Sequence, residues 1–157
     1  MVEELGGSNP RLRRIRRLAR DRSYRWTEAR YVVEGPTLVG EAMVAGLDVE
    51  QVLVPASAAS HDLVAAAQSA GVPCALVPDR IFEGLSTTRT SQPALAEVAC
   101  HDVPVSDLAA TRGTVLLLAG VGDPGNAGTL VRSAEAFGVS GVVFADGVDP
   151  YNPKVVR

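Results

Sequence analysis

The chain has 157 residues, of which 46% are hydrophobic but only 4% aromatic, so any core must consist mainly of aliphatic side chains. This composition excludes an extensively disordered protein, and no apolar run approaches the roughly 20 residues that span a bilayer. The net charge of −3 hides a basic segment, because residues 10–30 carry nine arginines against two acidic residues, whereas residues 31–157 have a balance of −8. Such an asymmetry predicts a localised contact with a polyanion.

The N-terminal part is expected to be a flexible leader over residues 1–9, followed by a helix over residues 10–20. Asn9 is a suitable N-cap, and Pro10 suits the first helical turn. A narrow apolar stripe consists of Leu12, Ile15 and Leu18. The other faces carry arginine at a density that favours phosphate binding, although a merely solvated face is the alternative. The candidate RNA-binding residues of this helix are Arg11, Arg13, Arg14, Arg16, Arg17 and Arg20.

Strand-like and helical segments alternate in the next eighty residues. The expected strands are 30–35, 48–55, 72–78 and 94–100, and the expected helices are 36–45, 59–70 and 79–84. This alternation predicts a small wound α/β sandwich. Between the last helix and the last strand lies the polar segment "STTRTSQP" at 86–93, in which Arg89 is a further candidate for RNA contact, with an ordinary surface role equally compatible.

A second domain is expected to begin near residue 114. The near-continuous apolar run "TVLLLAG" predicts a buried parallel strand, which a helix from about 126 to 137 connects to the strand "GVVFAD". One βαβ unit cannot bury both faces of a sheet, so we expect this domain to be incomplete in the chain. The predicted organisation is a leader at 1–9, a first domain at 10–103, a linker at 104–113 and the start of a second domain at 114–157.

The loop between these strands contains a glycine pattern, G-x-G-x-x-G, at residues 120–125. A P-loop would need Lys and Ser or Thr where Asn126 and Ala127 stand, so that interpretation fails. A dinucleotide cradle is disfavoured because Pro124 removes one of the backbone amides that would face a pyrophosphate.

The residues after the glycines indicate a different function for the loop. Asn126 is a candidate N-cap, and Arg132 lies six residues later on a face from which its side chain can lean back to the loop. Together they predict a site for a phosphate or a developing oxyanion, against the alternative of an ordinary cap and a surface arginine. The helix face expected to be buried consists of Ala127, Leu130, Val131, Ala134 and Phe137.

The cysteines and histidines do not indicate a further functional site. Cys74 and Cys100 have no CxxC partner and no histidine at ligand spacing, so we expect reduced, buried thiols. His61 and His101 are expected at the surface, and no metal site is predicted. The polar, basic N-terminus lacks the apolar core of a secretory signal, which favours a cytoplasmic protein.

The segment "VGDPGNAGTLVRSAEAFG" resembles the first signature motif of the SpoU (TrmH-type) RNA 2′-O-ribose methyltransferases of the SPOUT class. The matching residues are Asp123, Pro124, Asn126, Gly128, Arg132, Ser133 and Ala134. The segments "DGVDPYNPKVVR", "RYVVEGPTLVGEAM" and "STTRTSQPALAEV" are also similar to parts of this family. The resemblance implies a ribosomal-protein-like α/β domain that binds the RNA substrate, followed by the first βαβ unit of a knotted methyltransferase domain.

The resemblance also implies an activity, which is methyl transfer from S-adenosylmethionine to a ribose 2′-hydroxyl by a homodimer. Ribosomal RNA is favoured over transfer RNA as the partner, with no DNA or membrane. Arg132 would clamp a phosphate near the developing alkoxide, and Asn126 would hold the loop and contact the ribose. The family's later motifs follow residue 157, so S-adenosylmethionine is expected to bind mainly beyond this chain, which alone would be inactive. The alternative is a non-catalytic RNA-binding module.

Overall fold

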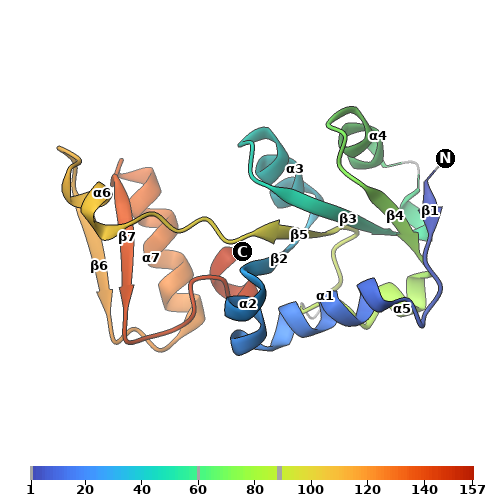
Figure 1. Ribbon diagram of the computed structural model, residues 1–157, viewed down its shortest axis with the longest axis horizontal. Coiled ribbons are helices and arrows are strands. Elements are labelled where there is room, and N and C mark those ends of the chain that lie inside the picture. The colour runs from blue at the N-terminus through green and yellow to red at the C-terminus, as the bar shows by residue number, and fades with distance from the viewer. Residues whose placement is uncertain (1, 60, 88–89) are drawn as a thin grey trace. The chain divides into compact units, whose positions relative to one another are not determined.

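The computed structural model describes residues 2–59, 61–87 and 90–157 of the α/β chain. The chain divides into two compact units, Met1–Cys100 and His101–Arg157, which are treated one at a time below. The first unit contains a five-stranded sheet and the second a two-stranded one (Figure 1). The mixed α/β class predicted from the sequence is confirmed.

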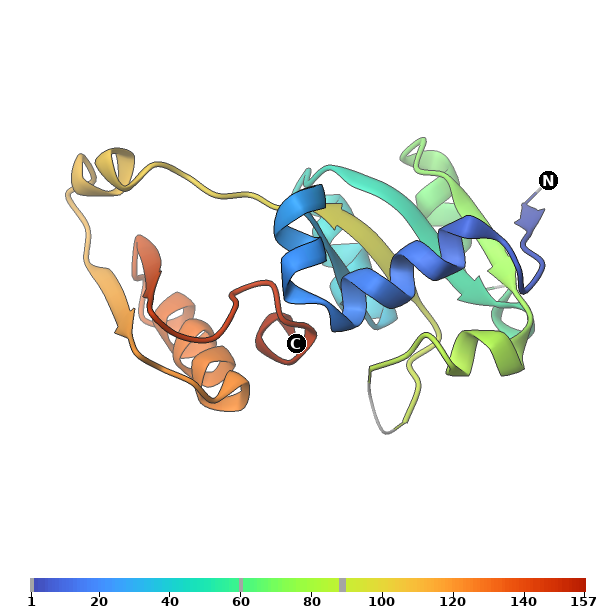
Figure 2. The ribbon, with the colours of Figure 1, turned by 60° about the horizontal axis from the view of Figure 1, so that its bottom comes forward.

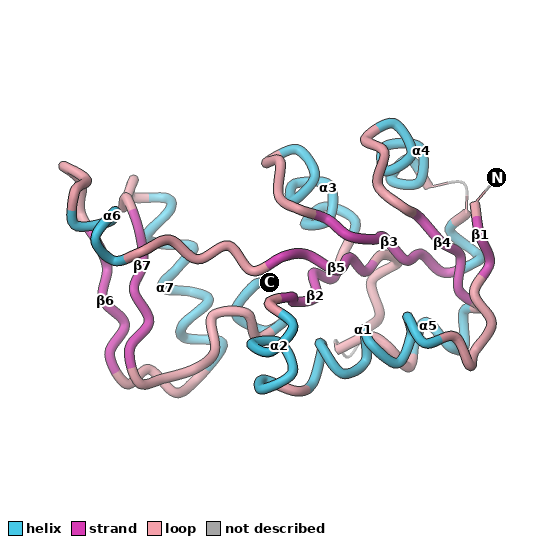
Figure 3. The backbone as a smooth tube through the Cα atoms, in the orientation of Figure 1, coloured by secondary structure: helices cyan, strands magenta, loops and turns pink. Residues whose placement is uncertain are grey.

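The sheet of the first unit has the strand order β1-β4-β3-β5-β2. The strands are β1 (Glu3–Glu4), β2 (Arg30–Glu34), β3 (Val49–Pro55), β4 (Cys74–Val77) and β5 (Leu95–Ala99). β4 runs parallel to both β1 and β3, whereas β5 runs antiparallel to both β3 and β2. Figure 3 shows how these strands form a single layer.

Helices cover both faces of this sheet, as the views of Figures 1 and 2 show. α3 and α4 lie on one face, while α1 and α5 lie on the other, with α2 next to α1. The bounds are α1 (Pro10–Arg20), α2 (Arg22–Glu28), α3 (Pro36–Val44), α4 (Asp62–Ser69) and α5 (Asp79–Glu83), with a 3₁₀ turn at Ala56–Ala58. The predicted sandwich is therefore the observed architecture.

The main core lies between α1 and the sheet. The predicted stripe Leu12, Ile15 and Leu18 is fully buried there, against strand residues such as Val32 and Leu53. The side chain of Asn9 accepts the backbone N–H of Arg11 at 2.9 Å, so the predicted cap is confirmed. Because α1 buries one narrow stripe, its remaining faces are left to arginine.

The leader expected over residues 1–9 is ordered where the structure describes it. Glu3 and Glu4 pair with β4, and the backbone N–H of Leu5 donates to Leu76 O at 2.8 Å. Leu5 itself is 1% exposed within the core. The prediction of a flexible leader was therefore wrong for these residues, because a two-residue strand is too short to produce a periodic pattern.

The second unit contains a parallel βαβ unit. Its elements are α6 (Val105–Ala109), β6 (Val115–Ala119), α7 (Pro124–Ala136), β7 (Gly141–Ala145) and α8 (Pro153–Val156). β6 and β7 pair in register from Val115 opposite Gly141 to Ala119 opposite Ala145. The segment predicted as a linker at 104–113 thus contains a short helix, and the compact units meet at residues 100 and 101.

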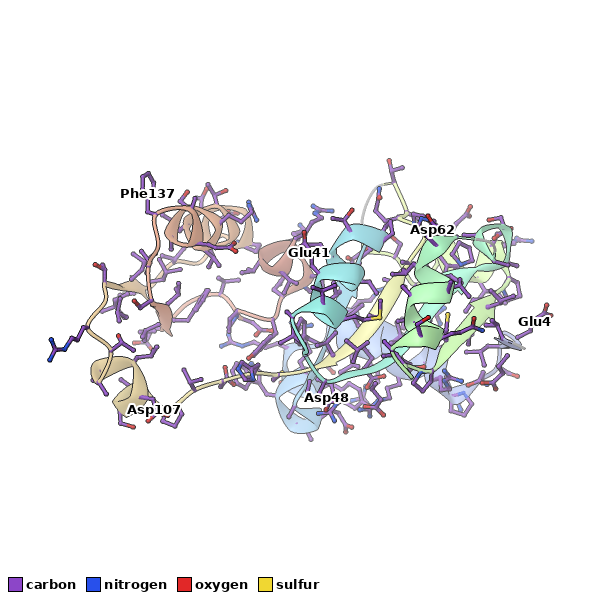
Figure 4. The ribbon with its side chains drawn as sticks, turned by 90° about the horizontal axis from the view of Figure 1, so that it is seen from above. Glu4, Glu41, Asp48, Asp62, Asp107 and Phe137 are labelled. Carbon is purple, nitrogen blue, oxygen red and sulfur yellow. The ribbon has the colours of Figure 1, made fainter. Side chains whose placement is uncertain are left out.

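In the second unit, only some of the apolar side chains of β6 and α7 are buried. Leu118 is buried, but its neighbour Leu117 is 60% exposed, so β6 is not buried on both faces as its apolar run predicted. On α7, Ala127 and Ala134 are buried as expected, whereas Phe137 is 88% exposed and Leu130 is also exposed. Figure 4 shows Phe137 at the end of α7, pointing away from it. The sequence periodicity identified the helix but overestimated the width of its buried face.

Candidate active site at the start of α7

The first turn of α7 is capped by Asp123. The Asp123 carboxylate accepts the backbone N–H of Asn126 at 2.7 Å, and Pro124 occupies the first helical position. The prediction that Asn126 is the N-cap was therefore wrong. Proline is favoured at the first helical position because its missing N–H is not needed there. The same rule that places Asn9 before Pro10 would have placed the cap at Asp123.

This cap changes the electrostatics of the helix start. A helix N-terminus attracts anions through its free N–H groups and its dipole. Here Pro124 has no N–H, the N–H of Asn126 is already bound, and the Asp123 carboxylate places negative charge at the same end. The turn is therefore poorly suited to hold a pyrophosphate or another nucleotide phosphate. Any substrate phosphate near this turn must be held by another group.

Arg132 carries a positive charge near this turn. Its Nη2 donates to Thr129 Oγ1 at 3.3 Å, one turn closer to the start of α7. Its Nη1 lies 3.0 Å from the position that a Cβ on Gly128 would occupy. The guanidinium thus leans over Gly128 towards the helix start, as expected for a long side chain on a helix. The Arg132 side chain is exposed, so it can meet a ligand from solvent.

Gly128 permits a close backbone approach. A Cβ at this position would lie 2.9 Å from the carbonyl oxygen of Val155 and 3.3 Å from that of Lys154, both in α8. The start of α8 is fixed by Asn152, whose side chain accepts the N–H of Lys154 at 2.9 Å. Gly128 therefore brings together α8 and the Arg132 guanidinium at one point on α7.

Asn126 lies at the same end of α7, with an exposed side chain. Its side-chain amide makes no hydrogen bond to any other residue that the structure describes, in contrast to its backbone N–H. A primary amide can both donate and accept hydrogen bonds. Asn126 and Arg132, the two predicted catalytic residues, thus both lie on α7, and their roles stay predictions.

Two side chains that the sequence did not single out organise the segment before α8. Asp149 is buried and accepts the backbone N–H of Tyr151 at 3.1 Å. The Tyr151 hydroxyl donates to Asp102 at 2.9 Å and accepts the backbone N–H of His101 at 2.8 Å. The Asp-Pro-Tyr-Asn-Pro run of turn-forming residues was the available signal. These contacts fix the segment that leads from β7 to α8.

The predicted RNA-binding arginines of α1 fall into two groups. Arg11 and Arg14 are half-buried and face carboxylates or amides of their own unit. Arg11 donates to Gln51 and to Glu3, each at 2.7 Å. Arg14 Nε donates to Glu97 at 2.7 Å, and its Nη1 donates to Glu28. These contacts give Arg11 and Arg14 a structural role, and RNA contact by them stays a prediction.

The charge of Arg14 is firmly held. Burial by itself would lower the pKa of its guanidinium, but hydrogen bonds and attraction from Glu28 and Glu97 outweigh it and raise the pKa above its ordinary value. Glu97 is fully buried on β5, and a buried carboxylate requires a charged or hydrogen-bonding partner. The pair therefore joins α1 to the centre of the sheet.

Arg13, Arg16, Arg17 and Arg20 form the exposed group. Arg17 stacks on the ring of Tyr24 at 3.8 Å, and Arg20 donates to Gly84 O at 3.4 Å. Arg13 and Arg16 form no hydrogen bond or ion pair with the residues that the structure describes. RNA binding by this group stays a prediction. Arg89 was also predicted, but it lies outside the described residues.

The remaining candidates do not form a site. Cys74 and Cys100 are free and half-buried rather than fully buried, and burial raises the pKa of the Cys74 thiol. His61 caps α4 by accepting the N–H of Leu63 at 3.1 Å. Within the described ranges, His, Cys, Asp and Glu form no cluster suited to a metal ion. No helix in that part of the chain is long and apolar enough to cross a membrane.

With this geometry in place, two family profiles account for most of the chain. Residues 9–96 match the MRM3-like substrate binding domain, and residues 113–157 match the SpoU rRNA Methylase family. The chain therefore belongs to the family of proteins with an MRM3-like substrate binding domain. The segment that carries Asn126, Gly128 and Arg132 is thus the one that matches the methylase profile.

Individual relatives agree with this membership. The 23S rRNA (guanosine(2553)-2'-O)-methyltransferase RlmP of Bacillus subtilis is 34% identical over 128 residues, which are 81% of this chain and 48% of that protein. An AdoMet-bound rRNA methyltransferase from Sinorhizobium meliloti shares the fold with a TM-score of 0.84 at 24% identity, over 99% of this chain and 59% of that one. The structure of an RNA 2'-O ribose methyltransferase matches with a TM-score of 0.76 at 28% identity, over 100% of this chain and 60% of that one.

The chain spans about half the length of the curated relative it matches.

Proposed function

We propose that this chain belongs to an enzyme that transfers a methyl group from S-adenosylmethionine to a ribose 2′-hydroxyl of RNA, with ribosomal RNA as the substrate class. The observation that carries the proposal is the position of Arg132, which leans over Gly128 towards the start of α7 within the segment that matches the SpoU profile. The 34% identical relative from Bacillus subtilis is a 23S rRNA methyltransferase, which supports the choice of ribosomal RNA.

Arg132 would act by positioning and by electrostatics. Arginine stays protonated, so it cannot serve as a base, but its fork of N–H groups can hold a phosphate oxygen. With the substrate phosphate held, the neighbouring ribose oxygen would lie close enough for the guanidinium to stabilise negative charge as the 2′-proton leaves. S-adenosylmethionine, when bound, supplies the electrophilic methyl group. The Asp123 carboxylate disfavours a phosphate at the helix start itself, so this role would fall to Arg132.

Asn126 would contact the substrate beside Arg132. Its side-chain amide is exposed one turn before Thr129, the residue to which Arg132 donates. A ribose hydroxyl can both donate and accept, so an amide is a suitable partner. The 2′-hydroxyl is also the group by which a protein distinguishes RNA from DNA. RNA, and not DNA, is therefore the nucleic acid we propose.

The first unit would supply affinity for the RNA substrate. Its exposed arginines on α1 provide the phosphate contacts that dominate binding to nucleic acids. We also propose that the enzyme is a homodimer in the cytoplasm, because the chain resembles this family.

The direct test uses the protein expressed from its whole gene, ribosomal RNA and S-adenosylmethionine with a tritiated methyl group. Wild-type protein should incorporate label at ribose, and Arg132→Ala should lower the rate about 100-fold or more while RNA affinity changes little. Arg112→Ala, an exposed arginine outside α7, is the matched control and should keep its rate. RNA binding without incorporation into any ribosomal RNA would favour a non-catalytic RNA-binding module instead.

A further inference from the structure

Glu34 is a buried carboxylate that the proposed reaction does not use. It is the last residue of β2 and is 7% exposed. Its side chain accepts hydrogen bonds from Ser86 Oγ, from Thr87 N–H at 3.0 Å, from Thr87 Oγ1 at 2.9 Å and from Gln92 N–H at 3.4 Å. One carboxylate therefore holds residues at both ends of the polar segment between α5 and β5.

This arrangement suits a carboxylate side chain. A carboxylate only accepts hydrogen bonds, and it offers about four lone-pair sites on two oxygens. The donors around Glu34 include two backbone N–H groups and two hydroxyls. A buried charge is costly unless it is hydrogen-bonded in this way. Glu34 is thus committed to fixing the backbone at Thr87 and Gln92, which have no regular secondary structure of their own.

The fixed residues begin next to the exposed arginines of α1. Arg20 Nη2 donates to Gly84 O at 3.4 Å, and Arg16 Nη2 lies 3.8 Å from the position that a Cβ on Gly84 would take. Gly84 precedes Ser86 by two residues. In Figure 2, the chain that follows α5 lies on the same side of the sheet as α1. The two guanidinium groups therefore lie at Gly84, two residues before the first residue that Glu34 holds.

A surface formed by these residues would suit an RNA backbone. Half or more of the hydrogen bonds between proteins and nucleic acids go to phosphate and sugar, from arginine, from Ser and Thr hydroxyls and from backbone N–H groups. Arg16 and Arg20 would meet phosphates. The Ser86 and Thr87 hydroxyls donate their hydrogens to Glu34, so their oxygens would accept hydrogen bonds from ribose 2′-hydroxyls. Such contacts require the polar residues to stay in place beside the arginines.

We propose that Glu34 is a positioning residue that holds Ser86, Thr87 and Gln92 beside Arg16 and Arg20 to form one RNA-backbone surface. The inference rests on the proposed function, because it names how the first unit of the RNA methyltransferase engages its substrate. Glu34 contributes through the residues that it holds and does not touch RNA.

The test is Glu34→Gln, because a purely electrostatic effect and a positioning role predict opposite changes in RNA affinity. Removing a negative charge near RNA would by itself strengthen binding. The Thr87 N–H donates to one oxygen of Glu34 and the Gln92 N–H to the other, so the N–H₂ group of glutamine would face one of these two N–H groups, and the positioning role predicts weaker binding. We expect Glu34→Gln to lower RNA affinity about tenfold. Glu41→Gln, an exposed carboxylate on α3 (Figure 4), makes the same charge change and should stay within about twofold of wild type.

Two further measurements separate positioning from general destabilisation. Hydrogen exchange of the Thr87 and Gln92 amides, followed without RNA, should accelerate in Glu34→Gln while strand amides of β3 stay protected. Thr87→Val, which leaves the carboxylate in place, should also lower RNA affinity, but by a smaller factor than Glu34→Gln. The double variant should lose less affinity than the sum of the two single effects, because both changes disrupt the same contacts.

The two possible failures are distinguishable. Glu34→Gln protein that binds RNA as tightly as wild type, or more tightly, overturns the positioning role and leaves the methyltransferase proposal standing. Wild-type protein that does not bind ribosomal RNA at all overturns the proposed function, and this inference with it.

Discussion

The Nε–H of Arg14 donates to Glu97 Oε1 at 2.7 Å, across 83 residues of sequence, and the Glu97 side chain is completely buried. Gln51 donates to the other oxygen of the same carboxylate at 2.7 Å. This relationship joins the basic helix to the middle of the sheet. It also divides the arginines of α1 into some that stabilise the fold and others that remain available to a ligand.

Replacement of Arg14 should destabilise the first unit. Arg14→Ala would leave Glu97 buried with only Gln51 as partner, which we expect to lower the free energy of unfolding by about 3 kcal/mol. Trp26, the single tryptophan, lies on α2 in the first unit, so its fluorescence during urea denaturation reports the relevant transition. The matched control is Arg13→Ala, an exposed arginine, which should change stability by less than about 0.5 kcal/mol. Equal denaturation midpoints for the two variants would show that Glu97 does not depend on Arg14.

Replacement of the exposed arginines should weaken RNA binding. The triple variant Arg13→Ala, Arg16→Ala and Arg20→Ala removes three candidate phosphate contacts. Each lost contact to single-stranded RNA should reduce the slope of log affinity against log salt by about 0.7. The predicted change in slope is checked by measuring affinity for ribosomal RNA over a range from low to physiological salt. Arg112→Ala is the single-arginine control, and an unchanged slope in the triple variant would mean that this face is only solvated.

A methyl group at Gly128 should disturb the candidate active site. The Cβ in Gly128→Ala would lie 2.9 Å from Val155 O and 3.0 Å from Arg132 Nη1, so α8 or the guanidinium must move. We expect methyl transfer to fall at least tenfold, because displacements of about 1 Å can cost a factor of 100. Gly122→Ala is the control, since a Cβ there meets nothing within 4 Å. Wild-type rates in Gly128→Ala would argue against this geometry.

Cys74 should react slowly with alkylating reagents. Burial raises the pKa of its thiol, which an attraction to Arg11 only partly opposes, so less thiolate is present near pH 8 than in a free cysteine. In a Cys100→Ser background, the midpoint of the alkylation rate against pH should lie above the ordinary value of about 8.5, and urea should return it there. The stabilisation linked to this shift is present below about pH 8.5 and is lost as pH rises through the folded pKa. A midpoint at the ordinary value would contradict this.

The fold was largely predictable because its signals are local. The stripe Leu12, Ile15 and Leu18 and the alternation of strands and helices were sufficient to predict the sandwich. The short strand β1 was missed because two residues give no period, and the exposure of Phe137 was missed because a helix pattern does not report how much of its face a neighbour covers. Both depend on contacts distant in sequence.

The candidate site was predictable in composition but not in arrangement. Arg132 and Gly128 were identified from the motif, yet the close approach of α8 to Gly128 appears only in three dimensions. Asp123 was missed as the cap although Pro124 carried the signal. The inward orientation of Arg11 and Arg14 could not be foreseen, because Gln51 and Glu97 lie far along the chain.

The most direct measurement is a map of ribose 2′-O-methyl groups in ribosomal and transfer RNA from cells with and without the gene. Our account predicts that a defined mark in ribosomal RNA disappears with the gene, returns with the wild-type gene and does not return with Arg132→Ala. Identical maps with and without the gene, or full restoration by Arg132→Ala, would contradict it.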